Sequence, residues 1–384
     1  MNGKIPLSNE DLDMTRIILI STLVPGAYLV LVASALLAIL IGTGLIYGIG
    51  YVAVNYIHRV PVGIFLLMGL GMLYAIWTVF YAIYKSVIVK PSFKTAITIN
   101  KRNETKLNEF VTGLCQKMGT EPPDNIILSA DPEFFVTQSK IKCFDGVTRG
   151  RVLGIGMPLL GSITINEFRA ILCHEFAHFT GNDTLYSKFV LPAYIGLQTA
   201  STQMQAIIDS DTNSDDTNWV GVPMLLPCWS LDKYLDVFHK LNMKISRARE
   251  LRADAISSQI CGSLCFAEAL KKVVAVGHIF NKVVVRDIKI FLDEDKVFKN
   301  YYRYFDDYVA EQSELVKNIQ VEATSAPENP YDSHPSLGTR LKNLPYTDMQ
   351  YRDEQKANTL LINLDEYEKD LTEYYTALVS HGYL

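Results

Sequence analysis

Residues 164–178 read Thr-Ile-Asn-Glu-Phe-Arg-Ala-Ile-Leu-Cys-His-Glu-Phe-Ala-His, and this stretch predicts a helix that presents two histidines on one face. Thr164 and Glu167 have the spacing of a capping box, in which each side chain bonds the backbone N–H of the other residue and starts a helix. Apolar side chains then recur at helical spacing. His174 and His178 are four residues apart, so both can offer an imidazole nitrogen to one metal ion.

A second predicted helix carries two acids with the same spacing. Residues 249–254 read Arg-Glu-Leu-Arg-Ala-Asp, and Glu250 is the natural third ligand for the two histidines. Two histidines and a glutamate form one of the known ligand sets of catalytic zinc, which keeps a fourth position for water. Asp254, one turn further on, can orient His174 or His178 through a hydrogen bond. The alternative for Asp254 is a solvated acid among neighbouring arginines.

These residues predict hydrolysis of peptide bonds by a zinc-activated water, with one Zn²⁺ per chain. Glu175 follows the first histidine and leans over the same site, so it is expected to act as the general base. The other readings are a chance H-E-x-x-H on an amphipathic helix, and a non-catalytic membrane scaffold with bound zinc. An open site with three ligands argues against structural zinc, which normally has four ligands rich in cysteine.

The chain resembles the membrane-bound zinc metallopeptidases (H-E-x-x-H gluzincins) that include the HtpX-like proteases and the CAAX prenyl endopeptidase. Three segments carry the resemblance, namely residues 174–183, residues 246–254 with the pattern S-R-x-R-E-x-x-A-D, and residues 332–340, which read Asp-Ser-His-Pro-Ser-Leu-Gly-Thr-Arg. The resemblance covers residues 101–345, and the apolar N-terminal segments extend it. It implies a peptidase of protein or peptide substrates.

The resemblance implies further site residues. Asp183 falls where bacterial members often carry an acid close to the zinc ligands. His334 and Arg340 are expected to approach the zinc site and to stabilise the oxyanion or orient the substrate. The alternative for His334 is an ordinary turn residue, because His-Pro favours an extended or turn conformation.

An extended substrate is expected to pair with an edge strand in this family. Residues 152–156 form a short apolar stretch that predicts this edge strand. Many relatives carry an Asn-Ala-Phe-type segment just before it. The nearest candidate here is residues 133–137, Glu-Phe-Phe-Val-Thr, which lacks the Asn.

Two uncharged stretches near the N-terminus predict membrane helices. Residues 17–57 and 60–84 carry no charged side chain, and a span needs about 20 predominantly apolar residues. The second stretch fits one helix. The first fits one tilted span, which we favour, or a hairpin that turns near residues 42–44. Residues 189–231 contain apolar segments too short to span, so membrane-surface contact or a lid over the substrate cleft is expected there.

Basic residues predict the orientation. The link between the two spans offers Arg59, whereas lysines and an arginine cluster after the second span, at positions 85, 90, 94, 101, 102 and 106. Because basic residues favour the cytoplasmic side, we expect an integral protein of the cell (inner) membrane with its zinc domain facing the cytoplasm. With two spans the N-terminus is cytoplasmic as well.

The expected fold is mainly α with a small β-sheet (α+β), in which N-terminal transmembrane helices precede a gluzincin-type zinc metallopeptidase domain. The expected parts are a cytoplasmic segment (1–16), a membrane region of two helices (17–90), the peptidase domain (91–345) and an acidic amphipathic tail (346–384). Strands are predicted at 126–128, 134–136 and 152–155, and an amphipathic helix at 103–118.

The amino-acid composition limits the classes of binding partner that can be expected. The net charge of −5 and the absence of a basic stripe with interleaved aromatics argue against nucleic acid. The 6 cysteines show no C-x-x-C pair and are expected to be reduced. The expected partners are protein or peptide substrates and the lipid bilayer, and the sequence leaves the oligomeric state open. Membrane protein quality control is the favoured role, and CAAX-type processing is the enzyme alternative.

Overall fold

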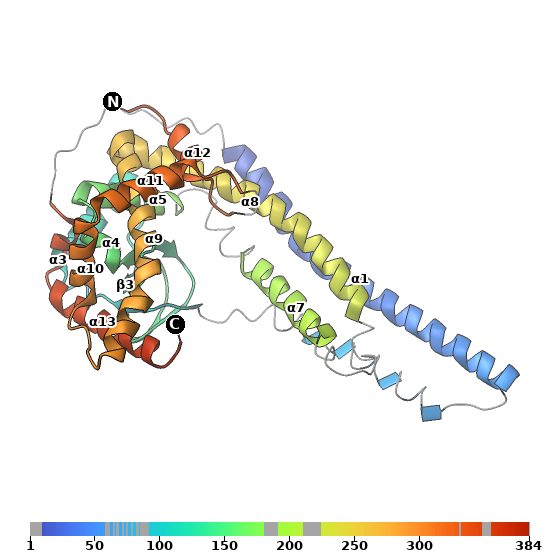
Figure 1. Ribbon diagram of the computed structural model, residues 1–384. Coiled ribbons are helices and arrows are strands. Elements are labelled where there is room, and N and C mark those ends of the chain that lie inside the picture. Colours follow the sequence, from blue (N-terminus) through green and yellow to red (C-terminus); the bar gives the residue numbers. More distant parts are fainter. Residues whose placement is uncertain are drawn as a thin grey trace. The chain divides into compact units, whose positions relative to one another are not determined.

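The structure is a computed structural model of the 384-residue chain. It describes residues 10–57, 92–179, 191–209, 224–329, 332–347 and 355–383, together with scattered residues between 62 and 84. The chain divides into two units (Figure 1). Unit 1 comprises residues 1–90 and 185–245, and unit 2 comprises residues 91–184 and 246–384.

Unit 1 is built from helices. They are α1 (Glu10–Val52), which continues into a π-helical turn at Ala53–Ile57, α7 (Leu191–Asp209) and the first part of α8 (Leu225–Cys261). Buried side chains from all three helices form one apolar cluster, which includes Leu31, Leu197 and Phe238. The phenol oxygen of Tyr194 on α7 lies 2.7 Å from Nδ1 of His239 on α8. Unit 1 therefore has a core of its own.

One helix among the described residues has the length and composition of a membrane span. It runs over Pro25–Tyr56 with a mean hydropathy of 2.7, and 11% of its most apolar window is buried. Since α1 is continuous through residues 42–44, the hairpin alternative for the first stretch is wrong. The predicted second span, residues 60–84, lies largely outside the described residues. Two N-terminal membrane helices are expected from the sequence, and the described residues contain one candidate helix.

Unit 2 contains two small sheets. The larger one has the order β2 (Ala96–Thr98), β3 (Asn125–Ser129), β7 (Val152–Gly156), β4 (Phe134–Thr137), in which β3 and β7 are parallel and the other pairs antiparallel. The smaller one has the order β1 (Ser92–Phe93), β5 (Ile141–Cys143), β6 (Gly146–Thr148). The three predicted strands are present in the larger sheet.

The prediction that residues 152–156 form an edge strand is wrong. β7 lies between β3 and β4, and all five of its residues are buried. A continuous apolar run is typical of a strand covered on both faces, but it does not specify whether the strand has a neighbour at one edge or at both. The outer edge belongs to β4, the segment that lacks the Asn of the relatives.

Helices make up the rest of unit 2. They are α3 (Thr105–Met118), α4 (Met157–Leu160), α5 (Ile165–Ala177), the last part of α8, α9 (Ser263–Asp293), α10 (Tyr301–Glu311), α11 (Ser313–Ser325), α12 (Leu337–Lys342), a 3₁₀ turn at Ala357–Leu360 and α13 (Leu364–Ser380). The predicted helix at 103–118 corresponds to α3, which ends where Gly119 adopts a left-handed φ of 65°.

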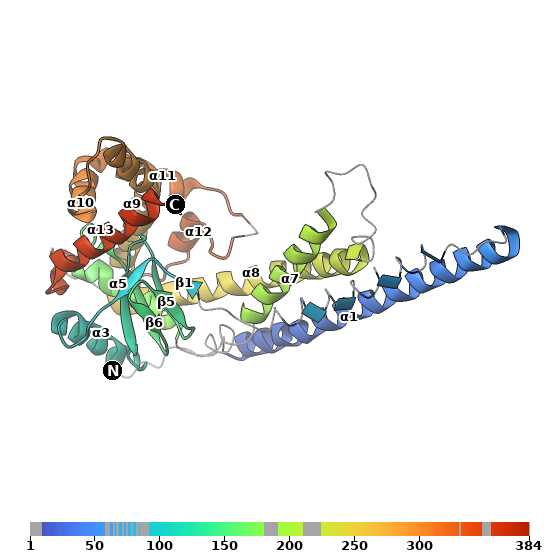
Figure 2. The same cartoon turned by 90° about the horizontal axis from the view of Figure 1, so that it is seen from below.

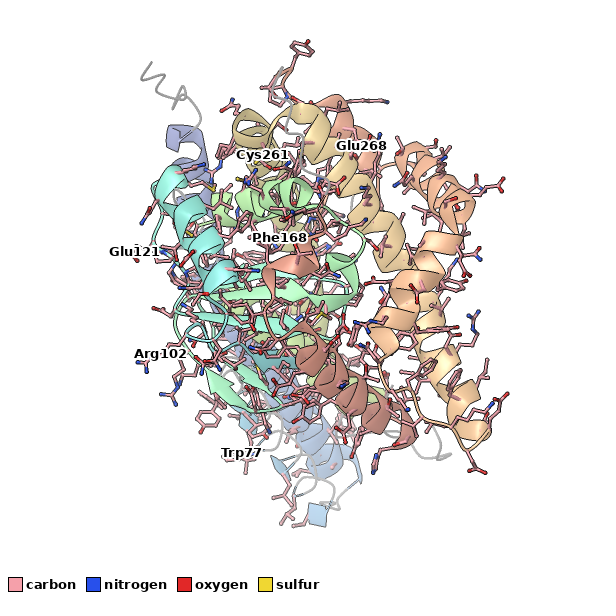
Figure 3. The ribbon with its side chains drawn as sticks, turned by 90° about the vertical axis from the view of Figure 1, so that its left-hand side faces the viewer. Trp77, Arg102, Glu121, Phe168, Cys261 and Glu268 are labelled. Atoms are coloured by element: carbon pink, nitrogen blue, oxygen red, sulfur yellow. The ribbon has the colours of Figure 1, made fainter. Side chains whose placement is uncertain are left out.

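One apolar core joins the larger sheet to these helices. Phe168 of α5 is fully buried in it, whereas Arg102 and Glu121 lie at the outside (Figure 3). Leu371, Tyr375 and other residues of α13 belong to the same core, so the acidic segment after residue 345 packs as part of unit 2. The fold is mainly helical with small mixed sheets, which confirms the α+β expectation at that level.

Candidate active site

The helix α5 begins with the predicted capping box. Thr164 Oγ1 accepts a hydrogen bond from the backbone N of Glu167 (3.2 Å), and Glu167 Oε2 accepts one from the backbone N of Thr164 (2.8 Å). Lys272 of α9 adds an ion pair, with its Nζ 2.7 Å from Glu167 Oε1. These contacts fix the start of the helix that carries both histidines.

A distant part of the chain also supports this helix start. The backbone N of Ile165 donates to the carbonyl of Gln355 at 2.9 Å, and the backbone N of Ala357 donates to the carbonyl of Ile163 at 2.9 Å. Residues 163–165 therefore pair with residues 355–357 like neighbouring strands. The segment before α13 thus holds the chain at the entry to α5.

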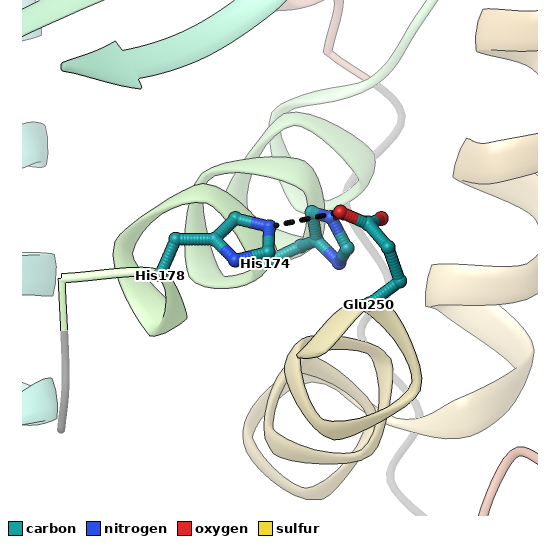
Figure 4. A group of neighbouring side chains, drawn as sticks. All are labelled: His174, His178 and Glu250. Atoms are coloured by element: carbon teal, nitrogen blue, oxygen red, sulfur yellow. Dashed lines mark ion pairs between the residues drawn. The ribbon is translucent and has the colours of Figure 1, made fainter. Parts of the chain in front are cut away.

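Three ligand-type side chains converge on one point. The imidazole rings of His174 and His178 lie with centroids 5.0 Å apart at 90°, and Glu250 of α8 faces them (Figure 4). Nε2 of His174 lies 3.4 Å from Glu250 Oε2, and Nε2 of His178 lies 3.4 Å from Glu250 Oε1. One ligand atom from each residue lies within 4.8 Å of the other two. The structure thus brings the three predicted ligands together.

The geometry of the three side chains fits zinc. Zn–N and Zn–O bonds of about 2.1 Å in a tetrahedron place neighbouring ligand atoms about 3.4 Å apart. Each imidazole lies at this separation from one Glu250 oxygen, His174 from Oε2 and His178 from Oε1. His174 and Glu250 are both buried. A buried carboxylate facing two imidazoles is an arrangement that a divalent cation stabilises, because burial of unpaired charge is costly.

Burial and neighbouring side chains change the pKa values of Glu250 and His174. Burial alone would raise the pKa of Glu250, but hydrogen bonds from His174 and His334 lower it well below its usual range. Burial alone would lower the pKa of His174, but hydrogen bonds to Asp254 and Glu250 raise it to about 9. Glu250 is therefore ready as an anionic ligand, and metal binding at His174 would release a proton.

Asp254 lies behind His174. Its Oδ1 is 2.9 Å from Nδ1 of His174, the ring nitrogen that does not face Glu250. Arg340 of α12 donates to the same carboxylate from Nε (2.9 Å) and Nη2 (2.6 Å). Burial would raise the pKa of Asp254, but its bonds to Arg340 and His174 lower it. Of the two histidines left open by the sequence, the structure pairs Asp254 with His174.

The late motif approaches the site through two residues. Nδ1 of His334 lies 3.0 Å from Glu250 Oε2, and the His334 side chain is 62% exposed. Arg340 is buried, with Nη2 3.7 Å from Glu250 Oε2. His334 therefore lies at the exposed side of Glu250, and Arg340 lies inside, against the carboxylates of Glu250 and Asp254.

Glu175 has the titration expected of a proton acceptor in such a site. Burial raises its pKa, and the nearby His174 and His178 imidazoles only partly oppose this effect. A raised pKa allows a carboxylate to take up and release a proton closer to neutral pH. Asp183, by contrast, lies outside the described residues.

The sequence did not indicate one aromatic neighbour of the site. The ring of Phe266 on α9 stacks on His174, with centroids 5.8 Å apart and planes at 20°. Phe266 is fully buried and forms part of the main core. An apolar residue in an amphipathic helix carries no signal that separates this contact from ordinary packing.

Comparison with known proteins gives a consistent result. Residues 102–348 match the family model "Peptidase family M48". Proteins named "Protease HtpX homolog" are similar to this chain: one from Methanopyrus kandleri (27% identity, 44% of this chain, 51% of the relative), one from Persephonella marina (26%, 47% and 61%) and one from Thermococcus sibiricus (23%, 60% and 75%). The chain thus spans between half and two thirds of the first two relatives.

A solved structure, the crystal structure of S. mikatae Ste24p, aligns with 80% of this chain and 63% of its own chain. The sequence identity is 16% and the TM-score is 0.35, a score too low to establish a common fold.

Proposed function

The chain belongs to peptidase family M48, and on that premise we propose that it is a membrane-anchored zinc metalloendopeptidase. The observation that carries this proposal is the convergence of His174, His178 and Glu250 within 4.8 Å of one another in a largely buried site. The HtpX homologues among its relatives are named as proteases.

His174, His178 and Glu250 would hold the ion. When bound, zinc would supply a polarised water and would stabilise the negative charge that develops on the scissile carbonyl oxygen. The fit of the three side chains to a tetrahedral ion supports this assignment. The cluster comes from two helices, α5 and α8, and α5 and the last part of α8 contribute to the core of unit 2.

Glu175 would act as the general base. Its carboxylate would take a proton from the attacking water and later pass that proton to the nitrogen of the leaving amine. The raised pKa of Glu175 suits both steps, because the acid form must be stable long enough to donate. Glu175 is next to the ligand His174, so its proton transfer would occur where the water is bound.

Asp254 and Arg340 would act as positioning residues. Asp254 would hold the His174 ring through Nδ1, which leaves Nε2 for the metal. Arg340 would fix Asp254 and partly offset the negative charge of Glu250. His334, which is exposed and next to Glu250, is the residue of this group that a substrate or an oxyanion could contact.

The substrate would lie along β4. This strand forms the outer edge of the larger sheet, and none of the described strands pairs with its free side. An extended peptide can add to such an edge by backbone hydrogen bonds. The strand proposed to pair with the substrate is therefore β4, Phe134–Thr137, in place of residues 152–156.

The N-terminal segments support a membrane association and suggest the class of substrates. The helix Pro25–Tyr56 would anchor the protein, and the basic residues after position 84 would keep unit 2 on the cytoplasmic side of the cell (inner) membrane. This location suits the cleavage of damaged or misassembled membrane proteins. Protein or peptide segments that reach the cytoplasmic side would be the substrates.

The test compares the full-length wild type with Glu175→Gln, purified in detergent with zinc. We expect the variant to lose cleavage of casein and of itself by a factor of ~10²–10⁴, while its zinc content stays at one ion per chain. Glu268→Gln, at a side chain that is 44% exposed, is the matched control and should retain wild-type activity.

Other outcomes would contradict the proposal in distinct ways. Loss of zinc from Glu175→Gln would mean that Glu175 holds the metal. Cleavage of prenylated C-terminal peptides alone would favour CAAX-type processing. Wild-type protein that binds zinc without cleaving any test substrate would favour a non-catalytic scaffold.

A further inference from the structure

The smaller sheet of unit 2 has one row of side chains that crosses all three strands. Phe93 of β1 pairs in register with Lys142 of β5, and Lys142 pairs with Val147 of β6. Residues directly opposite each other in a sheet point to the same face. Phe93, Lys142 and Val147 therefore share one face of the sheet, whose strands β1, β5 and β6 are labelled in Figure 2.

This face is open to solvent, whereas the other face is covered. Ile141 and Thr148, which point the opposite way, are buried. Phe93 is 51% exposed and Val147 is 52% exposed, which is unusual for large apolar side chains at paired strand positions. Lys142 is exposed as well. The Phe93 ring packs edge-on against Phe144, with centroids 5.6 Å apart, and about half of Phe93 and of Val147 remains open to solvent on either side of the lysine.

Two more basic residues extend the row. The register that pairs Ile141 with Thr148 brings Lys140 opposite Arg149, and both are exposed. They directly precede β5 and directly follow β6, next to the ends of the strands that carry Lys142 and Val147. The described residues offer no ion pair to these three cations, and the acid of the hairpin, Asp145, accepts a hydrogen bond from the Thr98 backbone. We call Phe93, Lys140, Lys142, Val147 and Arg149 the basic face.

The basic face lies close in sequence to the predicted membrane region. Residues 85–91 alone separate the end of the second uncharged stretch at Tyr84 from Ser92, where β1 begins. A fully extended chain covers at most ~3.6 Å per residue, so Ser92 lies within about 29 Å of the point where that stretch would leave the bilayer. If the predicted span forms, the sheet is within reach of the lipid headgroups.

From these observations we propose that the basic face docks on the anionic headgroup surface of the membrane. This inference rests on the membrane anchoring proposed above and goes beyond the peptidase activity. Each basic side chain near an anionic surface contributes about a fivefold preference for the docked state, and the two apolar side chains insert at the headgroup boundary. Lysines are depleted from the centres of protein–protein interfaces, so this mixture favours a lipid surface over a protein partner.

The experiment places a polarity-sensitive fluorophore on Val147→Cys in the full-length protein. Cys265, the one cysteine that is not buried, is replaced by Ser so that the label goes to one site. Val321→Cys on α11, at a residue that is 66% exposed, is the control position. Both labelled proteins are reconstituted in vesicles of phosphatidylcholine, with and without 30 mol% phosphatidylserine as the anionic lipid probe, on the order of a cytoplasmic leaflet's charge.

We expect the label at residue 147 to shift to shorter wavelength and to be quenched by brominated lipid in the anionic vesicles, and the label at residue 321 to stay unquenched. Lys140→Glu with Lys142→Glu should reduce the ratio of docked to undocked protein by at least about 25-fold, because loss of the two positive charges alone removes two fivefold contributions. The control pair Lys282→Glu with Lys289→Glu makes the same charge change on exposed residues of α9 and should leave that ratio unchanged.

Equal signals at residue 147 in neutral and anionic vesicles would overturn the proposal. So would a signal that responds to added casein and not to lipid, since this result would assign the face to substrate. Flotation of the vesicles separates this failure from a failure of anchoring: protein that does not float is not membrane-anchored at all. Casein cleavage by the Lys140→Glu, Lys142→Glu variant should match the wild type, because neither lysine belongs to the zinc site.

Discussion

Arg340 donates two hydrogen bonds to Asp254, from Nε at 2.9 Å and from Nη2 at 2.6 Å. Both side chains are buried, and Asp254 also contacts the Nδ1 of His174. A planar guanidinium matches a carboxylate in this forked geometry, which an ammonium cannot reproduce. The late motif of the sequence is therefore linked to the first histidine of H-E-x-x-H through one carboxylate.

Replacing Arg340 by Lys should weaken metal binding. A lysine keeps the positive charge but cannot form the two hydrogen bonds that Arg340 donates to Asp254. Asp254 would then orient the His174 ring less firmly, and the zinc affinity should fall by about 10- to 100-fold. Competition with a fluorescent zinc chelator measures this affinity. Saturating zinc should then restore much of the turnover, which distinguishes a positioning residue from one that contacts substrate. Arg303→Lys, in an exposed pair with Asp365, should change neither quantity.

Gly338→Ala should reduce the rate of peptide cleavage. The helix α12 packs so closely on α11 that a Cβ at Gly338 would meet the backbone carbonyl oxygen of Thr324. To avoid this contact α12 must move, and it carries Arg340. We expect casein cleavage to drop by at least about 10-fold, since small displacements of a catalytic group are costly. Wild-type turnover in Gly338→Ala would show that α12 can shift without disturbing the site.

Glu104→Gln should destabilise unit 2. The Glu104 carboxylate is fully buried and accepts hydrogen bonds from the backbone N of Ile362 (2.6 Å), the backbone N of Asn363 (2.9 Å) and Nδ2 of Asn363 (2.8 Å). An amide offers one acceptor oxygen and turns two N–H groups toward these donors, so the cost should be roughly 2–4 kcal/mol. Thermal unfolding in detergent measures it. Glu109→Gln, exposed on α3, which begins directly after Glu104, should leave the Tm unchanged.

Asp306 should make stability depend on pH. Burial, followed by repulsion from Glu368, raises the pKa of Asp306 to about 7. A folded-state pKa above the unfolded value means that the native state holds the proton more tightly, so stability is lost as pH rises from about 4 to 7. Asp306→Asn removes this loss. The Tm of the variant should lie nearest to that of the wild type at about pH 4, and its excess over the wild type should grow between pH 5 and pH 8 by an amount equivalent to roughly 3 kcal/mol.

Asp307→Asn is the control for that experiment, because Asp307 is exposed on the same helix. Its effect on Tm should be the same at both pH values. A difference between Asp306→Asn and wild type that does not vary between pH 5 and pH 8 would mean that Asp306 is already ionised in the folded protein at low pH.

The local parts of the fold could be predicted because their signals lie within one turn or one strand. The capping box at Thr164 and Glu167 and the left-handed Gly119 after α3 are set by neighbouring residues. The two histidines are also brought together by helical spacing alone. The approach of Glu250 could be proposed from its residue type and from resemblance, although its helix lies elsewhere in the chain.

The parts that were wrong or missing depend on long-range pairing. Whether residues 152–156 lie at the edge or the centre of the sheet is decided by β4, and no feature of the strand itself specifies this. The partners of Glu104 lie more than 250 residues away in the chain. The stacking of Phe266 on His174 likewise joins two helices whose apolar patterns show only that both are amphipathic.

The pairing of residues 163–165 with residues 355–357 has a consequence for biosynthesis. A ribosome delivers the chain from the N-terminus, so both histidines and Glu250 emerge well before the segment that supports the start of α5. Leu371 and Tyr375 of the common core emerge later still. The helix that carries the two histidines therefore lacks its final neighbours until translation has passed this segment, and we expect the proposed cleavage activity to begin only then.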